Sequence, residues 1–138
     1  MTPTIEHPIA GTLTYDDRVG WYATEVSPGV TLAGVPREGD DPLGALFDRV
    51  AADWQLFGSE AAQHAAEALV DLKNGSWLED EEDEVSPEAF RARLALRTVV
   101  VDGDGADFSF DDGDLFWGHT VMVDMDAAIT FSNAQIAG

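Results

Sequence analysis

Residues 96–123 read LRTVVVDGDGADFSFDDGDLFWGHTVMV and contain three β-prone stretches separated by two Asp-Gly turns. These stretches are rich in Val, Phe and Thr, which favour extended backbone, and they span residues 96–102, 107–110 and 115–123. The turns between them are DGDG at 102–105 and DDGD at 111–114, and Asp and Gly supply the conformations that tight turns need. The pattern predicts an antiparallel β-meander.

The beginning of the chain also contains β-prone segments. Residues 12–15 and 19–26 are rich in Thr, Tyr, Val and Trp, and Asp16-Asp17-Arg18 between them has turn chemistry. The two segments predict a hairpin, and a third short strand follows the turn at 27–29. We expect His7, which precedes the hairpin, to lie in an N-terminal tail without a role.

The middle of the chain has helical periodicity. Apolar residues recur at three- and four-residue spacing over 43–57, with Asp40 or Asp41 as the cap and Pro42 in the first position. We expect Gly58 to end this helix.

A second helix is predicted over 60–74, with Ser59 as its cap. Its Ala-rich face lets its axis approach a neighbouring helix closely, so that the two helices form an αα-hairpin. A third, short helix starts at the Ser86 cap with Pro87 and runs to about Arg93.

These elements predict an α+β fold, in which an antiparallel sheet built from the N-terminal hairpin and the C-terminal meander carries two or three helices packed on one face. The 138 residues fit a single domain, 1–138. Apolar groups at 99–101 lie on both faces of their strand, so we expect that strand to be covered on both sides. The segment 124–138 fits either a short strand or a helical turn.

The charge excludes several classes of partner. The chain has 27 Asp+Glu against 7 Lys+Arg, a formal net charge of -20, which repels phosphate backbones and anionic lipid headgroups. We therefore expect no direct binding of nucleic acid or membranes.

The absence of Cys excludes disulfides and thiolate zinc sites. The N-terminus lacks a secretion signal, which favours a cytoplasmic protein. No motif implies a cofactor, and we expect none.

The motif FDDGDLFWGH at 110–119 resembles the signature of an uncharacterised bacterial family, domain of unknown function 2262. Further pieces follow in the family's order, namely LTYDD at 13–17, GWY at 20–22, LKN at 72–74, WLED at 77–80 and AQIAG at 134–138. The resemblance spans nearly the whole chain, although 102–105 and 124–133 diverge. The family carries no established activity, cofactor or catalytic residue, so the resemblance implies no role for any position.

One candidate site lies in this motif. Three carboxylates in a turn, followed by an imidazole, are a donor set that suits a divalent cation; the residues are Asp111, Asp112, Asp114 and His119. The alternative is structural, because hairpin turns use Asp and Gly anyway and His119 fits a hydrogen-bonded histidine at the edge of the core. The resemblance of 102–105 to a calcium loop fails, since the glycine and glutamate that an EF-hand requires are absent.

Two surface features complete the candidates. Six consecutive acids occupy 79–84, and Glu79, Asp80, Glu81 and Glu82 begin this run, which we expect to form a solvated loop. Such an anionic surface steers a basic partner, or simply provides solubility. Aromatic side chains form the second feature, either as a surface platform or as core; they are Trp21, Trp77, Phe116 and Trp117.

Two functions remain open. The first is a non-enzymatic interaction module that binds a basic protein partner, for example an immunity protein that masks a toxin acting on nucleic acid. The alternative is a metal-dependent hydrolase that uses the Asp-rich turn and His119 to activate water. The sequence does not determine the oligomeric state.

Overall fold

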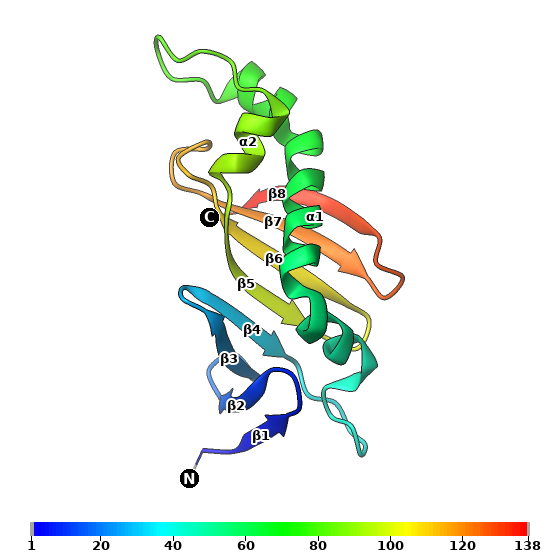
Figure 1. The fold of residues 1–138 in the computed structure, drawn as a ribbon. Coiled ribbons are helices and arrows are strands. Elements are labelled where there is room, and N and C mark those ends of the chain that lie inside the picture. The colour runs from blue at the N-terminus through cyan, green and yellow to red at the C-terminus, as the bar shows by residue number, and fades with distance from the viewer. Residues whose placement is uncertain (1, 138) are drawn as a thin grey trace.

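The computed structural model describes residues 2–137 and contains eight strands and two helices. In chain order the elements are β1 (Thr4–His7), β2 (Gly11–Asp16), β3 (Trp21–Ser27), β4 (Val30–Gly34), α1 (Gly44–Ser76), α2 (Pro87–Arg93), β5 (Ala95–Val101), β6 (Gly105–Asp111), β7 (Thr120–Asp126) and β8 (Phe131–Ala137). The strands form one sheet in sequence order, β1 to β8 (Figure 1). The fold is therefore mixed α+β, as predicted.

The sheet consists of two four-stranded meanders joined side by side. All neighbouring strands are antiparallel except β4 and β5, which pair in parallel from Thr31 opposite Thr98 to Gly34 opposite Val101. A parallel pair needs a long crossover connection, and α1 and α2 lie within that connection. The segment 124–138, for which the sequence left two possibilities, contains the edge strand β8.

The predicted αα-hairpin is wrong, because α1 is a single helix of 33 residues that continues through Gly58. A Cβ on Gly58 would lie 2.9 Å from Leu96 Cδ2, so the glycine permits a close approach to β5 and does not end the helix. The helix is kinked at Asp53 instead, where φ is -133° and ψ is 28°. The predicted cap is wrong, because α1 begins at Gly44 with Leu43 as its N-cap, so Pro42 is not in the first position. Asp41 nevertheless accepts a hydrogen bond from Gly44 N at 3.1 Å just before the helix.

Helix α1 lies across the β5–β8 half of the sheet, whereas α2 packs mainly against α1 (Figure 1). The alanine stripe of α1 is buried, and its small side chains let the helix pack closely; it comprises Ala61, Ala62, Ala65 and Ala66. Two or three helices were predicted on one face of the sheet; residues 2–137 contain two, and α1 packs on that face. Neither helix has an apolar stretch long enough to cross a bilayer.

The two faces of the sheet differ in chemistry. Val99, Phe108 and Val123 face one another across β5, β6 and β7 and are fully buried beneath α1. The next row, on the opposite face, consists of Val100, Asp107 and Asp124, which are half-buried or exposed. The expectation that 99–101 is covered on both sides is therefore wrong, because both helices of the described chain lie on one side (Figure 1).

His7 does not lie in a tail, because it ends β1 and its side chain is buried. Its Nε2 lies 2.6 Å from Asp48 Oδ1 on α1, and its Nδ1 accepts hydrogen bonds from Ile9 N and Ala10 N, both at 3.1 Å. Since Nδ1 accepts, the ring proton is on Nε2 and is donated to Asp48. The imidazole thus links the edge strand to the helix, with its ring edge-on to Phe47.

Candidate functional site

Residues 112–119 form a loop, although the sequence predicted a strand from residue 115; β7 begins only at Thr120. The carboxylate of Asp112, which is 0% exposed, organises this loop. Its Oδ1 accepts a hydrogen bond from Asp114 N at 2.9 Å, and its Oδ2 accepts from the backbone N–H groups of Phe116, Gly118 and His119 at 2.9, 3.1 and 3.0 Å. One side chain therefore satisfies four backbone donors of an irregular segment.

The other two carboxylates of the turn do not join Asp112 around a common point. Asp111 accepts a hydrogen bond from Gly113 N at 3.1 Å and another from Arg97 at 3.2 Å. Both bonds lower the pKa of Asp111, and the bond from the Gly113 backbone has the larger effect. The Asp114 side chain is exposed. Within residues 2–137 no group of three or more His, Cys, Asp or Glu side chains is arranged to hold a metal ion. Asp111 and Asp112 therefore accept hydrogen bonds from the backbone and from Arg97 and do not form a cation site.

His119 lies at the end of the loop and is half-buried. Its Nδ1 is hydrogen-bonded to Phe116 O, and because a carbonyl only accepts, Nδ1 carries the proton. The ring lies edge-on to Trp77, with the centroids 5.4 Å apart. This is the geometry of a hydrogen-bonded histidine at the edge of the core, which was the structural alternative in the sequence.

Three of the four predicted aromatic residues come together around this loop. Trp77, which follows α1, lies edge-on to Phe116 at 5.4 Å and tilted against Trp117 at 4.8 Å. Phe116 is fully buried, whereas Trp117 is 54% exposed. Trp21 is on β3, in the other half of the sheet, and does not belong to the group.

Trp117 also has a positive φ of 61°, which is uncommon for a bulky side chain. The Asp112 hydrogen bonds to Phe116, Gly118 and His119 fix the backbone on both sides of it. The loop therefore holds an aromatic ring at the surface in one defined position, with strain that the buried carboxylate offsets.

The acidic run lies in the loop between α1 and α2, which extends from one end of the molecule (Figure 1). Glu79, Asp80 and Glu81 are exposed, as predicted for a solvated loop, but Glu82 is half-buried. Lys73, the one lysine of the sequence, is fully buried and donates to Glu82 Oε1 at 2.8 Å and to Trp77 O at 2.7 Å. The hydrogen bond from Lys73, followed by one from Glu79 N–H, lowers the pKa of Glu82.

The far end of the acidic loop is fixed as well. Asn74 Nδ2 donates to Val85 O and Asn74 Oδ1 accepts from Val85 N, both at 2.9 Å. The residue pattern does not indicate this anchor, because an Asn near the end of a helix is also typical of a residue that terminates it. Together, Lys73 and Asn74 fix both ends of the loop, while its acidic side chains other than Glu82 are exposed.

Comparison with known proteins places the chain by family. A family model described as "Uncharacterized protein conserved in bacteria (DUF2262)" matches residues 7–136. The chain belongs to the DUF2262 family. No curated protein and no solved structure matches it significantly.

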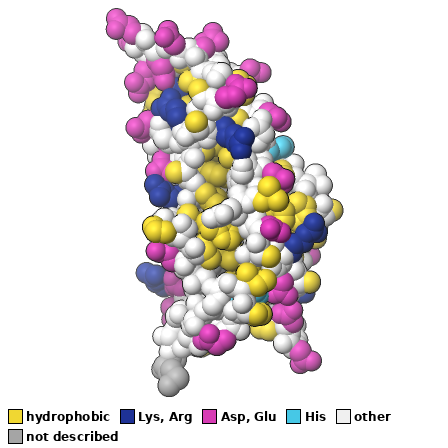
Figure 2. Space-filling model, in the orientation of Figure 1, with side chains coloured by type: hydrophobic (Ala, Val, Ile, Leu, Met, Phe, Trp, Pro, Cys, Tyr) yellow, Lys and Arg dark blue, Asp and Glu magenta, His cyan; other side chains and the backbone are white. Residues whose placement is uncertain are grey.

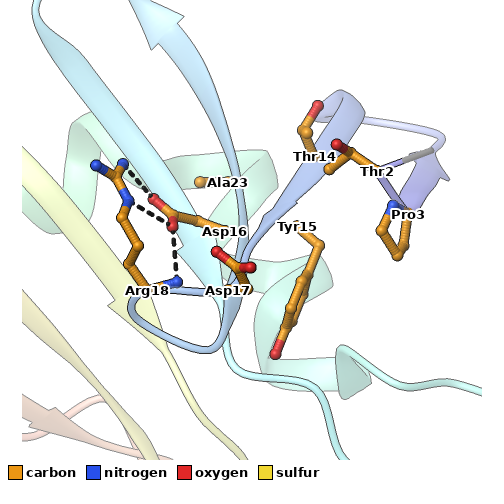
Figure 3. A pocket seen from close by; sticks show the side chains of 8 residues that line it. All are labelled: Thr2, Pro3, Thr14, Tyr15, Asp16, Asp17, Arg18 and Ala23. Carbon is orange, nitrogen blue, oxygen red and sulfur yellow. Dashed lines mark hydrogen bonds and ion pairs between the residues drawn. The ribbon is translucent and has the colours of Figure 1, made fainter.

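A hollow of about 770 Å³ in this DUF2262 chain lies away from the loop, beside β2, β3 and the turn between them (Figure 3). Its lining consists of Thr2, Pro3, Thr14, Tyr15, Asp16, Asp17, Arg18 and Ala23. Asp16 and Arg18 pair at 3.0 Å, and this contact lowers the pKa of Asp16 and raises that of Arg18. Tyr15 points away from this pair, so the side chains do not converge on a substrate (Figure 3).

A feature that sequence reasoning missed lies on the open face of the DUF2262 sheet. Asp107 on β6 faces Asp124 on β7, and Asn133 Nδ2 donates to Asp124 Oδ2 at 3.0 Å. Desolvation raises the pKa of Asp107 to about 6, and Asp124 and Asp102 contribute further. Finding this pair requires the register of two strands, which the residue pattern alone does not supply.

Proposed function

We propose that this DUF2262 protein is a non-enzymatic interaction module that binds a basic protein partner in the cytoplasm. An immunity-type inhibitor, which covers the cationic surface of a toxin that acts on nucleic acid, is one example of this class. The observation that supports the proposal is the excess of exposed carboxylates over available cations, concentrated in the loop after α1.

Internal ion pairs neutralise little of the charge. Of the 27 acidic residues, those that form salt bridges within residues 2–137 are Asp16, Asp48, Glu82 and Asp111. Lys73 and Arg93 both face Glu82, Arg97 pairs with Asp111, and Arg91 donates to the neutral side chains of Ser59 and Gln63. The rest of the acidic loop is left to interact with something else.

The loop is also placed for contact. Figure 2 shows acidic side chains gathered at the end of the molecule where the loop extends. Fixed anionic groups attract a cationic partner over about a Debye length and increase the association rate, an effect that added salt reduces. Because Lys73 and Asn74 anchor the loop, less conformational entropy is lost on binding.

The metal-dependent hydrolase finds less support in the same residues. A catalytic cation needs several oxygen or nitrogen donors directed at one point, with a position left for water. Asp112 directs both its oxygens at backbone N–H groups, and Asp111 is shared between Gly113 N and Arg97. Calorimetric titration with calcium, magnesium, manganese and zinc tests this alternative directly.

The proposed function is tested with a cationic probe, a labelled hexa-arginine peptide, titrated at low and high salt. In the test variant the five acids of the loop other than Glu82 become amides, which keeps the Lys73 contact. The matched control neutralises five exposed acids that make no hydrogen bond in the described structure, namely Asp17, Glu25, Glu38, Asp40 and Glu60.

Both variants have the same net charge, so a difference between them reports the position of the charge. We expect the loop variant to weaken binding several-fold more than the control, and the wild-type affinity to fall as salt rises. Equal affinities for the two variants, or no binding by the wild type at low salt, would show that the acidic loop is not a docking surface.

A further inference from the structure

Trp117 is the exposed aromatic ring of the loop, and its surroundings define what it can bind. The indole is 54% exposed and leans on Trp77, which in turn contacts the buried Phe116. A large apolar group that remains at the surface in a fixed position is typical of the centre of an interface. We refer to Trp117 and Trp77 as the tryptophan pair.

The charges next to the tryptophan pair are negative. Asp114 precedes Trp117 by three residues and is exposed, and Glu79 and Asp80, also exposed, follow Trp77. Two cations have partners already: Arg93 donates to Gly113 O of the same loop at 2.6 Å, and Lys73 is buried with Glu82. An exposed indole with carboxylates close to it in the sequence favours a cation over a neutral or anionic group.

We propose that the tryptophan pair is the anchor for an arginine side chain of the basic partner, an inference that rests on the proposed function. A guanidinium is planar, stacks on indole, and can donate at the same time to a neighbouring carboxylate. It is also more weakly hydrated than an ammonium, which lowers the cost of bringing it onto an aromatic surface.

The rigidity of the loop strengthens this assignment. Asp112 fixes the backbone on both sides of Trp117, and the Trp77 ring is held by contacts with Phe116 and His119. A ring that is already ordered loses little conformational entropy when a ligand stacks on it. The positive φ at Trp117, which is otherwise a cost, is then the means by which the ring is displayed.

The test compares how tightly the wild type, Trp117→Ala and Trp117→Phe bind the labelled hexa-arginine peptide. Fluorescence anisotropy of the label measures the binding. We expect Trp117→Ala to weaken binding about fivefold or more and Trp117→Phe to weaken it less, because indole is the best cation–π partner. The ratio of the Trp117→Ala dissociation constant to that of the wild type should persist at about 150 mM salt, where long-range attraction is screened. The control is Leu56→Ala, which removes an apolar side chain of similar exposure, 55%, from α1.

Each outcome separates the two proposals. If Trp117→Ala binds as tightly as the wild type, the arginine anchor is wrong, while salt-dependent binding through the acidic loop still supports the proposed function. If the wild type does not bind at low salt, the proposed function fails and the anchor fails with it. Thermal melting of each variant checks that it folds, and the indole N–H resonance of Trp117 should shift on titration only if the anchor is correct.

Discussion

Lys73 Nζ donates to Glu82 Oε1 at 2.8 Å, and this ammonium group is fully buried although it is the one lysine of a chain with a net charge of -20. A buried ammonium requires a counter-ion and further acceptors, and Glu82 and Trp77 O supply them. The contact therefore joins the end of α1 to the acidic loop, and the remaining acids extend from this anchor.

Replacing Glu82 should destabilise the protein in a pH-dependent way. Lys73 and the N–H of Glu79 lower the pKa of Glu82 below its ordinary value of 4.5, so the contact stabilises the fold above that pH and is lost as pH falls through the folded-state pKa. We expect Glu82→Gln to lower Tm at pH 7 and the difference from wild type to shrink below about pH 4.5. Thermal denaturation at several pH values measures this, and Glu84→Gln, in the same loop, is the control that should change little.

The carboxylate pair on the open face predicts the opposite pH dependence. The pKa of Asp107 is about 6 in the folded protein against 3.8 ordinarily, so its ionisation disfavours the fold, and stability falls as pH rises from 3.8 through 6. Asp107→Asn should stabilise the protein at pH 7 by about 0.5 to 1 kcal/mol, a modest gain because the side chain is exposed to solvent.

The gain from Asp107→Asn should shrink as pH falls from 6 towards 3.8 and disappear below 3.8, where the wild-type carboxyl is protonated in both the folded and the unfolded state. Urea denaturation at pH 7 and pH 4 checks this, with Glu25→Gln, an exposed acid on β3, as the control. A gain that is the same at both pH values would show that the ionisation of Asp107 is not its cause.

Removing the Asp112 carboxylate should be costly, because it leaves four backbone N–H groups of a partly buried loop without an acceptor. We expect Asp112→Ala to lower the free energy of unfolding by about 3 kcal/mol. Asp112→Asn, which retains one acceptor oxygen, should lower it less. Hydrogen exchange should speed up at the amides of Phe116 and His119, and slow exchange there in Asp112→Ala would contradict the proposed role.

Local features of the fold could be predicted from the sequence because their causes lie a few residues away. Ser86 accepts from Ala89 N at 3.1 Å and begins α2, and Asp102 accepts from Asp104 N at 2.7 Å in the turn after β5. A residue pattern contains both partners of such contacts. The turns, α2 and the C-terminal meander were therefore predicted, with strand ends shifted by a few residues.

Features with distant causes could not be predicted. Gly58 reads as a helix terminator until Leu96, 38 positions later, is seen to need the space. For the Asp-rich motif the sequence left a cation site and a structural turn open, and the residue pattern does not indicate that four backbone donors are directed at Asp112. The surface position of Trp117 likewise depends on the conformation of the loop 112–119, where the sequence predicted a strand from residue 115.

The contact between His7 and Asp48 gives the last prediction. β1 has four residues, and pairing with β2 alone is weak support for an edge strand, so the buried imidazole should contribute much of its attachment. His7→Ala removes the bond to Asp48 and leaves Ile9 N and Ala10 N without an acceptor. We expect a loss of about 2 kcal/mol in the free energy of unfolding and faster amide exchange over β1. His7→Asn, whose carbonyl oxygen can accept from the same turn, should recover part of the loss, whereas unchanged exchange over β1 in His7→Ala would mean that strand pairing alone holds the edge.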